Sequence, residues 1–261
     1  SKMELDTIVK SGHQFRVVSL ETLRPASPVV VPSHRAATEE RLPFTVRIVR
    51  SEQELEKAVF VRHSAYDRHV PAVAALLERA EAADCEPGTV VLLAESKLDG
   101  SPLGTMRIQT NRFRPLTLQQ SIELPAWLQG TSQAEATRLG VALGRVGRLV
   151  KTALFKAYWE YCLMEDIEWM TIAARSPLDR QYEALLFQDV VPGGEFIPMR
   201  HAGNIPHRVL AFNVPAAEKN WRQAGHPLCG FVFDTKHPDI DLSVREGLYE
   251  ASRTHRVRAV A

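Results

Sequence analysis

The chain has 261 residues, of which 45% are hydrophobic and 24% are charged, and its 32 Lys and Arg residues are balanced by 31 Asp and Glu residues. This composition is typical of a globular protein and excludes a disordered or fibrous chain. A net charge of +1 provides no overall attraction to nucleic acid or to an anionic membrane, so an acidic partner would have to meet a local basic patch.

The sequence predicts neither a membrane segment nor a metal site. No stretch reaches the roughly 20 apolar residues of a membrane helix, and the N-terminus lacks the pattern of a secretory signal. We therefore expect a cytoplasmic protein with no integral membrane segment and no nucleic-acid partner. Cys85, Cys162 and Cys229 are far apart and form no CxxC pair, which indicates reduced thiols and no bound metal.

One folded domain between two extensions is predicted. Residues 1–43 show little hydrophobic periodicity and contain four prolines, so we expect an irregular arm. The prolines are Pro25, Pro28, Pro32 and Pro43. Residues 44–215 carry the periodic segments of the domain, and residues 216–261 form a mixed C-terminal extension with a possible helix at 244–254.

The domain is predicted to begin with a strand that leads into a helix. Residues 44–50 (FTVRIVR) alternate like a half-buried strand. Ser51, with Glu54 three residues later, forms a capping box, which predicts a helix from there to about Tyr66. A second helical stretch is expected at 72–83 (AVAALLERAEAA).

A hairpin and an insertion are predicted next. Residues 90–96 and 103–110 are typical of two strands, and the turn at 98–101 joins them into a hairpin. Residues 111–133 contain two prolines and an apolar cluster. We expect this segment to be an insertion that lies over a groove.

The following elements are a strand, a glycine-containing turn and a helix. Residues 134–141 (AEATRLGV) predict the strand, and the turn at 144–147 leads into a helix whose apolar residues recur at helical spacing. These apolar residues are Val146, Leu149, Val150, Ala153, Leu154, Ala157, Tyr158 and Tyr161. A strand at 167–174, a short helix at 178–186 and a last strand at 207–214 complete the domain.

The order of these elements resembles that of the GNAT acyltransferases. The run at 134–141 resembles the E-x-x-R strand of bacterial acyl-homoserine-lactone synthases and of the related long-chain N-acyl amino acid synthases. The blocks at 92–110, 150–162 and 173–187 are similar to the N-acyl amino acid synthases in particular, and the resemblance covers about residues 44–190. It implies an α+β, GNAT-like fold: a mixed, mostly antiparallel sheet with helices on both faces.

The resemblance implies an enzyme that transfers a fatty acyl group from acyl carrier protein to the α-amine of an amino acid, as in the synthesis of bacterial signalling lipids. No bound cofactor is implied, because acyl-phosphopantetheine is the donor substrate. The turn at 144–147 only partly matches the pyrophosphate-binding loop of CoA-using GNAT enzymes, which disfavours acyl-CoA as the donor. Three alternatives stay open: an acyl-homoserine-lactone synthase, a CoA-dependent acetyltransferase, and a catalytically silent module that binds a carrier protein.

The donor site is expected where the strand meets the turn and the following helix. Amide groups at a helix N-terminus bind anions, and glycine lets a backbone approach closely, which suits a phosphopantetheine arm. The residues of this expected site are Leu139, Gly140, Val141, Gly144, Arg145, Gly147 and Arg148.

The same helix has a basic face that suits an acidic carrier protein. Its positive charges, from Arg145, Arg148, Lys151 and Lys156, exceed the single negative charge of Glu160. An ordinary solvated face of an amphipathic helix explains the pattern equally well, and the sequence leaves both interpretations open.

Glu135 and Tyr182 are the expected catalytic residues. Attack on a thioester needs a neutral amine, so Glu135 is expected to act as the base, and the resemblance places Tyr182 where many GNAT enzymes have a tyrosine that protonates the leaving thiolate. Residues three apart in a regular strand point to opposite faces, so Glu135 and Arg138 can meet only across a bulge. Such a bulge is typical of the family and leaves N–H groups free to polarise the thioester carbonyl.

Three arginines are expected in an interior charge network. Arg62 and Arg107 match arginines of both synthase families, where they accompany the counterparts of Glu135 and Arg138. They could orient the acceptor carboxylate by paired hydrogen bonds, and a purely structural network is the open alternative. The aromatic residues could line an acyl tunnel, although packing in the core is the more common role at these spacings. They are Trp127, Phe155, Tyr158, Trp159 and Trp169.

Overall fold

The computed structural model describes residues Thr7–Ser11, Gln14–Val18 and 38–260, and the chain divides into two compact units, Ser1–Ala37 and Thr38–Ala261. In the first unit, β1 (Thr7–Ser11) and β2 (Gln14–Val18) form an antiparallel pair. This pair differs from the irregular arm expected there, and three of the four arm prolines lie outside the described residues. The predicted domain and C-terminal extension both fall within the second unit, so the boundary between them stays a prediction.

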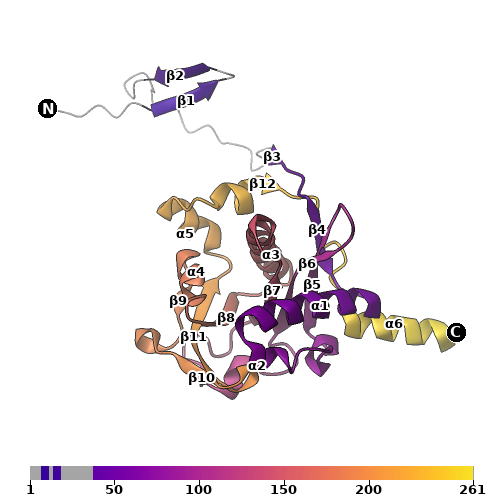
Figure 1. Ribbon diagram of the computed structural model, residues 1–261. Helices are drawn as coiled ribbons and strands as arrows, with labels where there is room; N and C mark the ends of the chain where they lie inside the picture. The colour runs from indigo at the N-terminus through magenta and orange to yellow at the C-terminus, as the bar shows by residue number, and fades with distance from the viewer. Residues whose placement is uncertain (1–6, 12–13, 19–37, 261) are drawn as a thin grey trace. The chain divides into compact units, whose positions relative to one another are not determined.

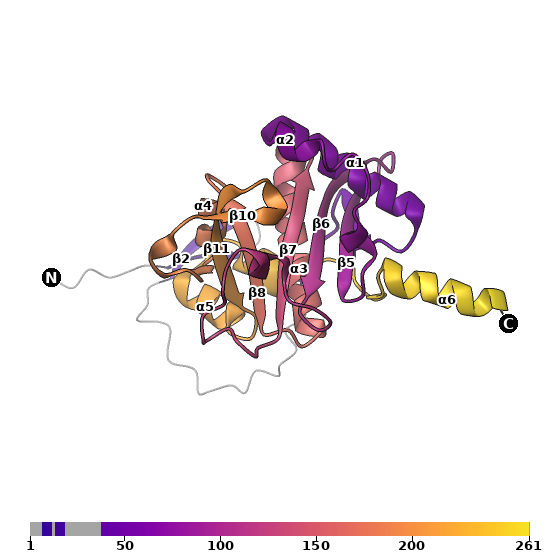
Figure 2. The same ribbon diagram turned by 90° about the horizontal axis from the view of Figure 1, so that it is seen from below.

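A nine-stranded sheet forms the centre of the second unit. Its strands are β4 (Phe44–Ile48), β5 (Thr89–Ser96), β6 (Pro102–Thr110), β7 (Gln133–Val141), β8 (Trp169–Arg175), β9 (Gln188–Asp189), β10 (Ile197–Met199), β11 (Ile205–Asn213) and β13 (Ile240–Asp241). The order is β10-β11-β8-β7-β6-β5-β4-β13, with β9 also paired to β11, and Figure 2 shows β5, β6, β7, β8 and β11 side by side. Only the β7–β8 and β4–β13 pairs are parallel. The predicted mixed, mostly antiparallel sheet is confirmed.

Helices cover both faces of this sheet. α1 (Glu52–His69) and α2 (Pro71–Ala74) lie on one face and α3 (Arg145–Met164) lies on the other, as Figure 1 shows around β5, β6 and β7. Alternate residues of β5 account for this layering: Val91 and Leu93 pack in a cluster with residues of α1, whereas Leu92 packs in a cluster with residues of α3. The strand is therefore buried from both sides.

Most of the predicted elements are confirmed, and the second helical stretch is wrong. The Ser51 hydroxyl accepts a hydrogen bond from the Glu54 amide at the start of α1, as the capping box predicts. In the stretch at 72–83, however, α2 ends at Ala74, and only a 3₁₀ turn, η2 (Ala82–Cys85), follows. The Asp84 side chain accepts from the Glu81 amide, and such a local side-chain bond competes with a continuous helix.

The insertion after β6 forms a small core of its own. It contains a 3₁₀ helix, η3 (Thr117–Gln120), and its residues Leu116, Leu118 and Leu128 pack with Val209 and other residues of β11 and its surroundings. The insertion therefore covers the part of the sheet that α1 leaves open.

The C-terminal part of the chain packs against α3 and the β4 edge. Its remaining elements are α4 (Asp179–Ala184), η4 (Pro192–Gly194), η5 (Arg200–Ala202), α5 (Ala217–Ala224), the π-helix η6 (Gly230–Asp234), α6 (Leu248–Val260), and β12 (Thr235–Lys236), which pairs with β3 (Thr38–Glu39). Lys156 is buried, and its Nζ donates to the carbonyl oxygens of Phe231 and Thr235 at 3.1 and 2.6 Å. The expected place of Lys156 on an exposed basic face is therefore wrong, because these carbonyls bind its ammonium group in the interior. In the described part of the chain, no helix is both long and apolar enough to cross a membrane.

Candidate active site

A cavity of about 280 Å³ opens where β7 and β8 separate. The two strands pair in parallel from Gln133 and Trp169 as far as Ala136 and Ile172. Beyond that point β7 stays paired with β6 and β8 stays paired with β11. Residues 136–141 of β7 and the C-terminal half of β8 line the cavity together with the end of α1. We refer to this space as the cavity.

The cavity wall has polar and cationic side chains but contains no Asp or Glu. The polar and cationic residues in its lining are Tyr66, His69, Thr137, Arg138, Lys151, Arg175, Tyr182, His201 and His207. A wall of this kind suits a ligand that carries a carbonyl oxygen or a negative charge.

A bulge in β7 determines which of its side chains point to the α1 face. Arg138 has a left-handed backbone (φ 55°), and the register between β6 and β7 shifts near this position. As a result, the consecutive residues Thr137 and Arg138 reach the same side of the sheet: Arg107 Nε donates to Thr137 Oγ1, and both Arg107 and Arg138 bind Glu81. The predicted bulge is therefore present.

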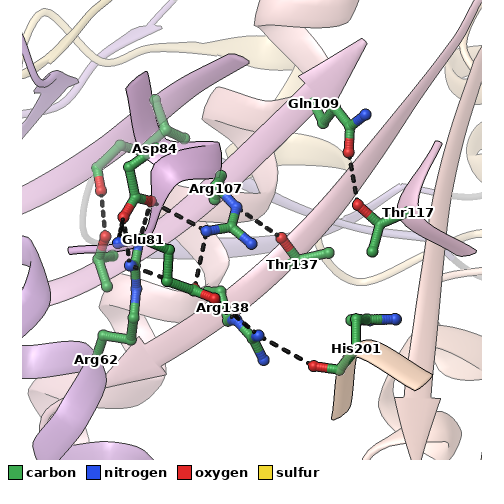
Figure 3. A network of polar contacts seen from close by, with 11 residues as sticks. Arg62, Glu81, Asp84, Arg107, Gln109, Thr117, Thr137, Arg138 and His201 are labelled. Atoms are coloured by element: carbon green, nitrogen blue, oxygen red, sulfur yellow. Dashed lines mark hydrogen bonds and ion pairs between the residues drawn. The ribbon is translucent and has the colours of Figure 1, made fainter. Parts of the chain in front are cut away.

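Three arginines share two carboxylates beside the cavity, and we call these five residues the arginine network (Figure 3). Arg62 donates to both oxygens of Asp84 at 3.0 and 2.9 Å. Arg107 Nη1 donates to Glu81 at 2.9 Å and to Asp84 at 3.1 Å. Arg138 donates to both oxygens of Glu81 at 2.9 and 3.1 Å. The three arginines expected in a charge network thus lie together, but their partners are Glu81 and Asp84, and the expected member Glu135 is not hydrogen-bonded to them.

Each arginine of this network is hydrogen-bonded to a carboxylate, and the three positive charges share two negative ones. Arg62 is completely buried and Arg107 is 4% exposed, and neither lines the cavity. Burial alone would raise the pKa of Glu81 and of Asp84, but the hydrogen bonds from the arginines outweigh it and hold both pKa values below their ordinary range. Both carboxylates are therefore ionised, and the arrangement favours the structural alternative for Arg62 and Arg107.

Glu135 lies under the insertion rather than in the cavity wall. Its side chain is completely buried, and Oε1 accepts a hydrogen bond from the Leu118 amide at 3.0 Å. Oε2 has no hydrogen-bond partner among the described residues. Burial raises the pKa of Glu135 to about 7 against the opposing effects of the Leu118 amide and Arg107. The residue holds the insertion on the sheet, and its role as the base stays a prediction.

Tyr182 lines the cavity and also a second, apolar one. The second space, of about 170 Å³, is lined mainly by apolar side chains on the α3 side of the sheet, among them Met106, Phe155 and Phe187. Five residues line both spaces: Ala136, Leu139, Lys151, Ile172 and Tyr182. Burial raises the pKa of the Tyr182 phenol, so it carries its proton at neutral pH. The role of Tyr182 as the acid that protonates the leaving thiolate stays a prediction.

His207 was not singled out in the sequence, and it presents a proton acceptor to the cavity. The residue is 7% exposed, and its Nδ1 lies 2.6 Å from the carbonyl oxygen of Ile205. A carbonyl oxygen only accepts, so Nδ1 carries the proton and Nε2 keeps a lone pair, with no hydrogen-bond partner among the described residues. Burial, Arg175 and Arg138 together lower the pKa of His207, which keeps the imidazole neutral at pH 7.

The donor residues expected from the sequence divide into two groups. Leu139, Gly140 and Val141 line the cavity. The others, Gly144, Arg145, Gly147 and Arg148, do not line it, and Arg145 and Arg148 are exposed. A Cβ atom on Gly147 would lie 1.8 Å from the carbonyl oxygen of Ala142, so the chain's own backbone accounts for that glycine.

Comparisons with known proteins agree with this fold. No family model matches the chain, and no curated protein matches its sequence. The structure is similar to that of FeeM, an N-acyl amino acid synthase from uncultured soil microbes, with 19% identity over 69% of this chain and 96% of that one and a TM-score of 0.56. It is also similar to BjaI, a CoA-dependent acyl-homoserine lactone synthase solved with SAM and isopentyl-CoA, with 15% identity over 81% of this chain and 99% of that one and a TM-score of 0.50. The resemblance predicted from the sequence thus extends to the GNAT-like fold of acyltransferases.

Proposed function

We propose that this chain is an N-acyltransferase that moves a fatty acyl group from a phosphopantetheine thioester to the α-amine of an amino acid. The observation that carries the proposal is the cavity between the separated strands β7 and β8, which shares five lining residues, Tyr182 among them, with an apolar cavity. A thioester has a polar reacting centre and an apolar chain, and this pair of spaces matches both parts. FeeM and BjaI share the fold and are synthases of acylated products.

The thioester is proposed to lie in the gap between β7 and β8, with its acyl chain in the apolar cavity. The β7 edge beyond Ala136 is not paired with β8, and in the wide gap its backbone can polarise the thioester carbonyl. Phe155 and Phe187 form part of the apolar wall on the α3 side. Of the five aromatic residues suggested for an acyl tunnel, two line this wall, Phe155 and Tyr158.

The proposed chemistry needs one proton acceptor and one proton donor. As the amine nitrogen attacks the carbonyl carbon, a proton moves from nitrogen to His207 Nε2, and the C–N bond forms while the C–S bond breaks. The departing thiolate takes a proton from Tyr182. His207 lines the cavity and Glu135 does not, and the competing hypothesis that Glu135 is the base is distinguished from this one by pH dependence below.

Acyl carrier protein is the proposed donor partner. Arg145 and Arg148 are exposed at the start of α3 and suit the acidic surface of a carrier. The turn at 144–147 only partly matches the pyrophosphate-binding loop of CoA-using GNAT enzymes, which disfavours acyl-CoA. BjaI uses a CoA donor on the same fold, so acyl-CoA is the second candidate.

The test combines three donors, acyl carrier protein, acyl-CoA and acyl-pantetheine, each with a mixture of amino acids or with SAM as the acceptor. The products are identified by mass spectrometry. An N-acyl amino acid supports the proposal. An acyl-homoserine lactone from the SAM reaction would establish the alternative synthase. Absence of acceptor-dependent thiol release with every donor would contradict the proposal and favour the silent binding module.

A further inference from the structure

Arg175 is a cation without a counter-ion in the cavity wall. It ends β8, is half-buried, and lines the cavity. Among the residues that the structure describes, none forms an ion pair or a hydrogen bond with its side chain. A half-buried guanidinium without a partner is costly, because it has lost water without gaining an acceptor.

Lys151 adds a second positive charge to the same wall. Its Nζ donates to Gln181 Oε1 at 2.8 Å, which is a neutral partner. Burial and the charge of Arg175 lower the pKa of Lys151, and burial, Arg175 and Lys151 are among the causes that lower the pKa of His69 at the rim. These mutual effects show that the cationic groups lie close enough to repel one another.

Arg138 lines the same cavity and differs in one respect. Its guanidinium is neutralised from behind by Glu81, at 2.9 and 3.1 Å. Arg62 and Arg107 are likewise matched by carboxylates and lie outside the cavity lining. The three arginines that the sequence suggested for an acceptor carboxylate are therefore already occupied, whereas Arg175 is available.

We propose that Arg175 and Lys151 form an anion subsite of the cavity, which binds a carboxylate or phosphate oxygen of a substrate. The planar guanidinium offers paired donors to such a group, and the ammonium adds a point charge. No Asp or Glu in the cavity lining competes for them. The subsite rests on the proposed function only for the identity of the ligand: the anion is the phosphate of the donor arm or the carboxylate of the acceptor.

Binding measurements separate these two sources and need no turnover. NMR titrations of the full chain compare 4′-phosphopantetheine with pantetheine, and glycine with glycinamide, in the wild type and in Arg175→Gln and Lys151→Gln. Arg180→Gln is the matched control, because Arg180 is exposed on the neighbouring α4 and does not line the cavity. Arg175→Lys keeps the charge and replaces Arg175→Gln if that variant unfolds.

We expect the wild type to bind the anionic member of one pair about tenfold or more tighter than the neutral member. This preference should fall at least fivefold in Arg175→Gln and by less in Lys151→Gln. It should not change in Arg180→Gln. In Arg175→Lys the preference should decrease only in part. A preference for 4′-phosphopantetheine assigns the subsite to the donor, and a preference for glycine assigns it to the acceptor. Equal binding within both pairs, or a preference that survives both Arg175→Gln and Lys151→Gln, would overturn the proposal. A protein that shows the preference but never releases thiol would contradict the proposed function and leave the subsite standing.

Discussion

The arginine network and the cavity wall are neighbouring regions of one sheet. They differ in whether their arginine side chains have carboxylate counter-ions. In the network, Arg62, Arg107 and Arg138 each donate to Glu81 or Asp84 at distances of 2.9 to 3.1 Å. In the cavity wall, Arg175 has no counter-ion among the described residues. An ion-paired network stabilises a fold, whereas a cation without a counter-ion is stabilised when a ligand binds. The difference suggests that the network holds the bulge in position and that the cavity performs the chemistry.

Asp84→Ala tests the structural side of this comparison and should have the largest effect on stability. It leaves the completely buried Arg62 without its paired acceptor, and removing one partner of a buried ion pair costs about 3–5 kcal/mol in the free energy of unfolding. Urea denaturation measures this loss. Glu86→Ala is the control, because Glu86 pairs with the half-exposed Arg114 and its loss should cost under about 1 kcal/mol. Equal losses in the two variants would contradict a structural role for the network.

His207→Gln tests the chemical side. Because the amide cannot accept a proton from the amine, kcat for acyl transfer at pH 7 should fall about 10²- to 10³-fold, within the range for a positioned general base. The melting temperature should change little, since glutamine can retain one hydrogen bond. Thiol release with a pantetheine thioester measures the rate. A kcat within threefold of the wild type would remove His207 from the mechanism.

The pH dependence distinguishes His207 from Glu135 as the proton acceptor. Burial, Arg175 and Arg138 hold the pKa of His207 below its usual 6.5, so kcat should be constant at neutral pH and fall only as the pH drops below 6.5 and the imidazole becomes protonated. If Glu135 were the base, the fall would be centred at about pH 7, and Glu135→Gln would lower kcat by about 10²- to 10⁴-fold with partial recovery at high pH. We expect Glu135→Gln to keep wild-type turnover at neutral pH.

Tyr182→Phe should have a smaller effect on the same reaction. A phenol that protonates the departing thiolate acts only as charge develops, so kcat should fall about 10- to 100-fold while acceptor binding is preserved. The loss is at the low end for acid catalysis because a thiolate is already a tolerable leaving group. Single-turnover thiol release isolates the chemical step. An unchanged single-turnover rate would reduce Tyr182 to a packing residue beside Phe187, whose ring centre is 5.5 Å away.

Charge reversal at the start of α3 should have the smallest effect. Arg145→Glu with Arg148→Glu should raise KM for a carrier-protein donor about threefold to tenfold at low salt, because both side chains are exposed and their attraction is screened by ions. The KM for a short pantetheine thioester is the internal control and should not change. Equal increases for the two donors would point to a direct contact with pantetheine instead of a protein docking face.

The sequence predicts the elements of this fold well where a local pattern defines them. The alternation of residues 134–141 and the helical spacing from Val146 to Tyr161 give β7 and α3 within a few residues of their ends. The bulge was expected from the family resemblance, because only a bulge brings the side chains of this strand to one face. The β7 and α3 patterns depend on neighbours along the chain, which is why the sequence contains them.

The charge partners at the site could not be read from the sequence. Glu81 lies 26 residues from Arg107 and 57 from Arg138, in a stretch whose composition favours a helix that the fold does not form. Arg175 and His207 face each other only through the antiparallel register of β8 and β11. A single sequence contains no signal for such pairings, so the network carboxylates and the unmatched cation emerge only from the fold.

The most direct test of the central claim is the lipid content of cells that express the chain. Mass spectrometry of extracts should detect an N-acyl amino acid with the wild type, and a greatly reduced amount with His207→Gln at equal protein level. Asp84→Ala should retain the product in proportion to the folded protein that remains. Extracts of wild-type cells that contain no N-acylated amino acid above the level of cells without the chain would contradict the account.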